Sequence, residues 1–367
     1  MNVRSLLFAA AGTLTLSLAS AQVDYVGQIA LPDGHNIVVR QAVNPSSAGN
    51  NYLYLVTTKQ LYTSTPPATG NTFAWSPPVE FQAGNIGLGT STIAIAPAEK
   101  NNPGGDLLTM SGSRNAIYSY NLTAQSRQLV ETVSSTGGIP DAMAVQQATN
   151  RVLIAKTNQI FAGVRGDLEI RPDLTEGTTL LIDGDGVGTG NNHFVNLTEM
   201  AFAGDAFGGL LFTLDWGAQK VKAFDIDDPD GNYFRYAFDL PTGLELNVEG
   251  HGMTINNYGH LFIADGRGGG MEFSLTGEVL ATFSPPEDQL YGASNGLTGL
   301  NPAPYDASQD ATFITYTKDG NIFVMDGKYG LHRYRDTAAY SVPEPATCAA
   351  LAATAALGLA ACRRRRT

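Results

Sequence analysis

Two short segments of the chain are near copies of each other, and this repeat constrains the fold more than any other feature. Tyr258–Gly266 reads as a turn, an apolar strand and an Asp-Gly turn, and Asp319–Gly327 repeats that order. Further strands are predicted before and after each copy, over Met253–Asn256, Gly269–Leu275, Phe313–Tyr316 and Gly330–Arg335. Short apolar runs bounded by Gly, Asn and Asp are typical of strands, so the unit is three consecutive strands joined by tight turns.

Weaker copies of this unit precede the clear pair. Their first apolar runs are Asn36–Val39, Thr92–Ile95, Asp141–Val145 and Glu199–Phe202. Units recur roughly every 55 residues, and six of them fill the chain between its two ends. Sustained helical periodicity is absent outside those ends, which favours an all-β fold.

Four-stranded units repeated around an axis form a β-propeller, which leaves few strand edges exposed. The segment Asp319–Gly327 resembles the NHL repeat, and the whole chain resembles a six-bladed NHL or gluconolactonase-like β-propeller. A pair of β-sandwiches is the alternative architecture.

The N-terminal part of the mature chain offers a strand for closing the ring. The last unit shows three strands before the tail, while Tyr25–Leu31 reads as a strand ahead of the first unit and resembles Glu278–Phe283, the fourth strand of unit five. We predict that the N-terminal strand completes the last blade, with Pro285–Gln309 as an insertion. An alternative alignment starts the last blade at Gly296–Leu300 and removes this closure.

The N-terminus has the three parts of a secretory signal peptide. Arg4 supplies a positive charge, Leu6–Leu18 is apolar, and Ala19 and Ala21 form an A-x-A cleavage motif, so the mature chain should begin at Gln22. A membrane anchor or a buried helix is the alternative, although the apolar run is short for a membrane span.

The C-terminus also has three parts, in a fixed order. The motif Val342, Pro343, Glu344, Pro345 comes first, the uncharged run Ala346–Cys362 follows, and the basic cluster Arg363, Arg364, Arg365, Arg366 comes last. We predict a membrane helix over the apolar run. The arginines should remain in the cytoplasm by the positive-inside rule, which leaves the preceding chain outside.

This tail, from Ser341 to Thr367, resembles the PEP-CTERM sorting signal of exosortase substrates. The resemblance implies a Gram-negative host, transient anchoring in the inner membrane, and processing near the Pro-Glu-Pro motif by an exosortase-type enzyme. It also implies attachment at the cell surface or release, often alongside exopolysaccharide. The expected organisation is a signal peptide over 1–21, an ectodomain over 22–340 and a sorting signal over 341–367.

Composition excludes some functions for the ectodomain. The chain has 22 Lys and Arg against 34 Asp and Glu, a net charge of −12, and such an acidic surface repels nucleic acid. Its two cysteines, Cys348 and Cys362, lie in the tail, so the ectodomain has no disulfide, no thiol chemistry and no Cys-ligated metal.

Candidate metal ligands fall at two kinds of position. Residues at the entries of the innermost strands would ring one mouth of the channel, namely His35, Asp141, Glu199 and His251. Imidazole and carboxylate groups are ligands for divalent cations. Gluconolactonase-like enzymes hold a metal in such a place, but this chain does not reproduce their ligand set at matched positions. The alternative is a ring of polar residues that solvates the mouth.

Two Gly- and Asp-rich loops are candidates for calcium. Asp183 and Asp185 alternate with glycine in the first loop, and Asp225–Asn232 is the second. Calcium binds several oxygens on a flexible backbone, but neither loop completes the EF-hand spacing. Acidic hairpin turns are the alternative, because Asp, Asn and Gly are common turn residues.

The features together favour an exported binding or extracellular-matrix protein, associated with exopolysaccharide or with another surface protein. The sequence shows no complete catalytic constellation, which favours a non-enzymatic role. The alternative is a metal-dependent, lactonase-type hydrolase that uses the channel mouth, and a fold alone does not distinguish the two.

Overall fold

The structure of the 367-residue chain is a computed structural model. It describes residues 23–29, 39–43, 53–57, 60–64, 73–77, 79–80, 93–96, 106–110, 116–121, 126–132, 139–146, 151–157, 166–171, 179–182, 194–195, 197–241, 244, 252–256, 258–265, 268–286, 313–317, 320–326 and 330–337.

The described strands form six four-stranded antiparallel sheets. The first sheet in chain order contains β2 (Val39–Val43), β3 (Leu53–Thr57), β4 (Gln60–Ser64) and β5 (Val79–Glu80). The second contains β6 (Ile93–Ala96), β7 (Asp106–Met110), β8 (Ala116–Asn121) and β9 (Ser126–Thr132). The third contains β10 (Ile139–Gln146), β11 (Arg151–Thr157), β12 (Gly166–Arg171) and β13 (Thr179–Ile182). The fourth contains β14 (Leu197–Phe202), β15 (Leu211–Asp215), β16 (Lys220–Phe224) and β17 (Phe234–Asp239). The fifth contains β18 (Met253–Ile255), β19 (His260–Ala264), β20 (Gly270–Ser274) and β21 (Val279–Phe283). The last contains β22 (Phe313–Tyr316), β23 (Asn321–Asp326), β24 (Gly330–Asp336) and β1 (Val23–Ile29).

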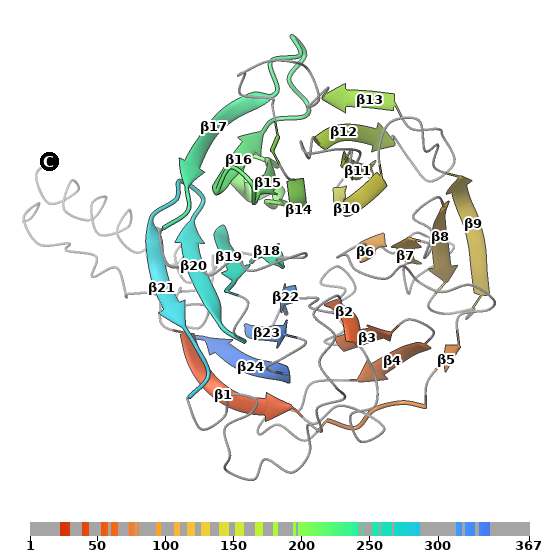
Figure 1. Cartoon of the computed structure of the whole chain (residues 1–367), viewed down its shortest axis with the longest axis vertical. Helices are drawn as coiled ribbons and strands as arrows, with labels where there is room; N and C mark the ends of the chain where they lie inside the picture. Colours follow the sequence, from red (N-terminus) through yellow and green to blue (C-terminus); the bar gives the residue numbers. More distant parts are fainter. Residues whose placement is uncertain are drawn as a thin grey trace, which may run out of the picture.

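The sheets surround a central axis in the manner of a β-propeller, as Figure 1 shows. Neighbouring innermost strands contact one another in the order β2, β6, β10, β14, β18, β22 and back to β2. The all-β class and the propeller-like arrangement predicted from the sequence are therefore confirmed, and the pair of β-sandwiches was the wrong alternative.

The sheet that contains β22 to β24 takes its outermost strand from the other end of the chain. β1 pairs antiparallel with β24, from Val23 opposite Asp336 to Ile29 opposite Leu331. In Figure 1 the two strands lie side by side, red against blue. The alternative start at Gly296–Leu300 lies outside the described residues, and β22 is the innermost strand of this sheet.

The repeated turn between the first and second strands has a physical cause. Gly259 and Gly320 each have φ of 78°, a left-handed conformation that glycine adopts without steric cost. The residue after each glycine donates its backbone N–H to the side chain that directly follows the first strand: His260 to Asn256 Oδ1 at 2.8 Å, and Asn321 to Thr317 Oγ1 at 3.0 Å. These turns recur because the same backbone geometry is required in both units.

Apolar side chains fill the spaces between neighbouring sheets. β15 is buried along its whole length, as expected of a strand with another sheet on each side. Between the β14–β17 and β18–β21 sheets the core includes Phe212, Leu214, Val221, Leu261, Ile263 and Phe273. Between the β18–β21 sheet and the sheet of β1 and β22–β24 it includes Phe262, Phe283, Ile314, Tyr316, Val324 and Tyr334.

The two predicted export signals lie outside the described residues. These are the signal peptide over 1–21 and the C-terminal helix within 341–367. In the described part of the chain, no helix has the length and apolar character to span a membrane. The only helix there is the 3-10 turn η3 (Asp205–Phe207).

Candidate functional site

The structure places two of the four channel-mouth candidates on neighbouring innermost strands. Asp141 is the third residue of β10 and Glu199 the third residue of β14, and these strands pack against each other. The Glu199 side chain is buried. His35 and His251 lie outside the described residues, as do Asp183 and Asp185. Among the residues that the structure describes, no three His, Cys, Asp or Glu side chains lie close enough to hold a metal ion.

Three innermost strands have a β-bulge near their entry, which the sequence did not reveal. The pairing shifts between Val39 and Gln41, between Pro140 and Ala142, and between Leu197 and Glu199. In each case the shift lies opposite the end of the second strand of the sheet. Bulges re-aim side chains and are common next to binding and active sites. These three inner strands therefore depart from regular pairing at one common level, where the mouth was expected.

A buried ion pair anchors the entry of β14. Lys222 Nζ lies 2.8 Å from Asp215 Oδ2, and the two side chains are 7% and 0% exposed. Asp215 also accepts the backbone N–H of Val195 at 3.1 Å and that of Ala218 at 3.3 Å. The ammonium lies 4.6 Å from the centre of the Phe194 ring, a cation–π distance. The pair thus ties the segment before β14 to the second and third strands, and so helps to fix the strand that carries Glu199.

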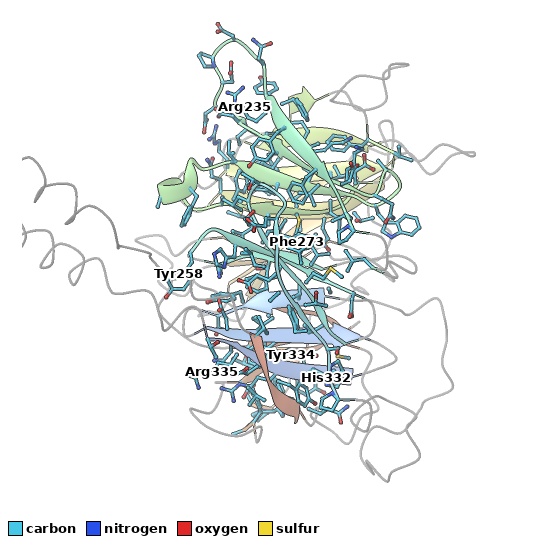
Figure 2. All side chains as sticks on the ribbon, turned by 90° about the vertical axis from the view of Figure 1, so that its left-hand side faces the viewer. Arg235, Tyr258, Phe273, His332, Tyr334 and Arg335 are labelled. Atoms are coloured by element: carbon cyan, nitrogen blue, oxygen red, sulfur yellow. The ribbon has the colours of Figure 1, made fainter. Side chains whose placement is uncertain are left out.

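The second Asp-rich loop holds arginine side chains. Arg235 donates to Asp225 Oδ2 at 2.7 Å and to Asp228 Oδ2 at 2.6 Å, on a loop that projects from the molecule in Figure 2. Arg151 pairs with Asp227 at 2.6 Å, and its hydrogen bond holds the pKa of that carboxyl below its ordinary value. Because two guanidinium groups pair with three of the aspartates, the loop is better described as a salt-bridged hairpin than as a calcium site.

A third polar group lies between the β18–β21 sheet and the sheet that contains β1. His260 Nδ1 is 2.5 Å from Glu272 Oε1. Asp336, on the neighbouring sheet, raises the pKa of Glu272 through its charge. Asp336 accepts a hydrogen bond from Asn256 Nδ2 at 3.2 Å and another from the Tyr316 hydroxyl at 3.1 Å. Sequence reasoning did not select any of these side chains. The available signal was His260 itself, which stands in one copy of the repeat where the other copy has Asn321.

Comparisons with known proteins identify the tail and the fold. Residues 341–366 match the PEP-CTERM protein-sorting motif. No curated protein matches the sequence. Among solved structures, a luciferin-regenerating enzyme superposes with a TM-score of 0.52 at 13% identity, over 86% of this chain and 94% of that one. The calcium-binding protein regucalcin from Agrobacterium tumefaciens superposes with a TM-score of 0.50 at 11% identity, over 85% of this chain and 93% of that one.

These matches define a class of protein. At 11–13% identity the structural likeness to the luciferin-regenerating enzyme and to regucalcin shows the fold alone, a β-propeller. The chain is a β-propeller protein that carries a PEP-CTERM sorting motif at its C-terminus, so both parts of the resemblance stated from the sequence are confirmed.

Proposed function

We propose that this protein is an exported, exosortase-sorted β-propeller that acts at the cell surface, or after release, as a binding or matrix protein associated with exopolysaccharide. The observation that carries the proposal is the PEP-CTERM motif at 341–366, which follows the propeller directly. The signal peptide over 1–21 directs export, and the 346–362 helix anchors the chain transiently in the inner membrane. The tail is then cleaved near Pro343–Pro345.

The position of the chain ends supports this division of the chain. In the proposal, the six sheets are six blades and β1 closes the ring by completing the last one. β1 begins at Val23, directly after the expected cleavage site before Gln22, and β24 ends at Asp336, shortly before the sorting motif. Cleavage at both sites would leave every strand that the structure describes intact. Hydrogen bonds between β1 and β24 would then join the two ends of the mature domain without a disulfide.

The sorting proposal predicts a defect in processing. The triple variant Pro343→Ala, Glu344→Ala, Pro345→Ala is expected to stay in the membrane fraction with its tail attached, because the motif no longer directs cleavage. Wild type should reach the surface fraction or the medium without its tail. The measurement is immunoblotting of cell fractions from a Gram-negative host with and without an exosortase.

Thr347→Ser, which lies after the motif, is the matched control and should behave as wild type. Equal processing of the triple variant and wild type, or equal processing without an exosortase, would contradict the proposal. Binding of the released domain to host exopolysaccharide is measured separately, by co-sedimentation.

The second candidate function is a metal-dependent, lactonase-type hydrolase. The bulges at the entries of β2, β10 and β14 favour it, because they mark the level at which Asp141 and Glu199 stand on adjacent strands. His35 and His251 would complete the ligand set, and calcium or another divalent cation would polarise the substrate carbonyl.

The hydrolase reading predicts one stoichiometric divalent ion per chain. Elemental analysis of the dialysed protein should find it in wild type, while the variant Asp141→Asn, Glu199→Gln should have lost it. The variant Asp183→Asn, Asp185→Asn is the control and should retain it. Metal-free wild type would refute the hydrolase, and loss only in the control variant would indicate a structural loop site.

A further inference from the structure

Glu272 has an unusual position for a carboxyl group. It lies in β20 at the interface between the β18–β21 sheet and the sheet of β1 and β22–β24, here called the seam, and it has no exposed surface. One oxygen, Oε1, contacts His260 Nδ1, while the buried Oε2 makes no hydrogen bond within the described part of the chain. A buried, ionised carboxylate with an unsatisfied oxygen is costly.

Asp336 lies across the seam and is also fully buried. Asn256 Nδ2 and the Tyr316 hydroxyl donate hydrogen bonds to it at 3.2 and 3.1 Å. Burial raises the pKa of Glu272 above its ordinary value, and the charge of Asp336 raises it further, whereas the hydrogen bond from His260 acts in the opposite direction. The titratable groups that contact or act on Glu272 are His260 from β19 and Asp336 from β24, and Tyr316 from β22 contacts Asp336. Tyr334 of β24 and Tyr25 of β1 also lie in the seam, with Asp265 acting on Tyr334.

The other clear copy of the repeat shows that this arrangement is not required by the fold. Asn321 stands at the position of His260, and Arg333 stands opposite Phe323 as Glu272 stands opposite Phe262. There, Arg333 Nε donates to Asn321 Oδ1 at 2.8 Å. That pair does not change charge between pH 4 and pH 8, because a guanidinium stays protonated and an amide does not ionise. Glu272, in contrast, is an ionisable carboxyl whose pKa burial raises.

His260 connects the buried carboxyl to solvent. Its side chain is 27% exposed, and its Nε2 has no hydrogen-bond partner among the described side chains and backbone groups. Tyr258, in the turn that precedes His260, lies at the edge of the molecule in Figure 2, on the side that also carries Arg335. A proton can therefore enter at Nε2 and leave from Nδ1 to Glu272 Oε1, which gives the seam one exchangeable proton.

We propose that His260 and Glu272 form a proton-operated latch at this seam. With the proton bound, Glu272 is neutral beside Asp336 and the two sheets pack tightly. Without it, two buried carboxylates face each other, and the sheet of β1 and β22–β24 separates more readily from its neighbour. An exported protein meets the pH of its surroundings, so the latch would tighten the ring in mildly acidic conditions.

The sign of the effect follows from proton linkage. The pKa of Glu272 is higher in the closed seam, where the carboxyl is buried, than in an open seam. At pH values above its ordinary pKa of 4.5, the closed seam therefore binds more protons than the open one. Its contribution to closure is complete below pH 4.5 and is lost as the pH rises through the raised pKa. Over that window, the closing constant should fall by up to about tenfold per pH unit for a single proton.

The test is amide hydrogen exchange of the full-length chain in mild detergent, followed from pH 4.5 to 8 by mass spectrometry of peptides from β20 and β24. In wild type, the closing constant of the seam should fall with pH. In Glu272→Gln, which keeps the acceptor for His260 but carries no charge, it should be independent of pH. Glu278→Gln, at an exposed glutamate directly before β21 of the same sheet, should follow wild type.

A second variant keeps the proposal testable if Glu272→Gln folds poorly. The pair His260→Asn, Glu272→Arg installs the Asn–Arg pair of the last sheet and should also remove the pH dependence. Parallel pH profiles for wild type and either variant would overturn the latch, and so would a seam that tightens as the pH rises.

Discussion

Replacing Lys222 with alanine is expected to lower the free energy of unfolding by about 3–5 kcal/mol. The substitution leaves the fully buried Asp215 without its cationic partner 2.8 Å away. It also removes the ammonium from the face of the Phe194 ring. Urea unfolding followed by tryptophan fluorescence measures the lost free energy of unfolding. Trp216 serves as a probe, because it directly follows Asp215, the last residue of β15.

The matched control for this prediction lies two residues away on the same strand. Lys220 pairs with Asp239 at 2.6 Å, but these side chains are 41% and 79% exposed. Lys220→Ala should therefore cost less than about 1 kcal/mol. Equal losses for the two variants would mean that the Asp215–Lys222 pair does not anchor the entry of β14 as described.

Replacing Phe262 with alanine is expected to lower the free energy of unfolding by about 3–5 kcal/mol, because the cavity would lie between two sheets. The ring has no exposed surface and stacks on Tyr316 of the next sheet, with centroids 5.6 Å apart. Phe283 lies 6.4 Å from it in the same cluster. The measurement is again equilibrium unfolding in urea.

Val279→Ala serves as the control for Phe262. Val279 belongs to the same sheet but is 45% exposed, so its truncation should change the free energy of unfolding by less than about 0.5 kcal/mol. A loss for Phe262→Ala as small as that of the control would mean that the sheets do not depend on this contact.

The sequence predicted the fold where local geometry determines it. The strands expected at Phe313–Tyr316 and Gly330–Arg335 appear as β22 and β24, within one residue of the predicted bounds. They were predictable because Gly259 and Gly320 must adopt the same left-handed turn in both units. The first four units have weaker sequence copies, yet the structure gives each of them a four-stranded sheet.

The contacts of the buried polar side chains were not predictable from the spacing of residues in the sequence. Glu272 and Asp336 are far apart in the sequence and meet only because two neighbouring sheets pack face to face. Lys222 reads as an exposed residue of a strand, but β16 is covered on both faces and the side chain must pair with Asp215. The bulges were also missed, because a bulge is defined by pairing with the neighbouring strand, which the residues of one short strand do not reveal.

The central claim is that the propeller is exported and separated from its sorting tail, and intact mass spectrometry tests it most directly. The sample is protein recovered from the surface fraction or the medium of a host with an exosortase. The account predicts a single species that begins at Gln22 and ends close to the Pro343–Pro345 motif. A recovered species that retains Arg363–Arg366 would contradict it.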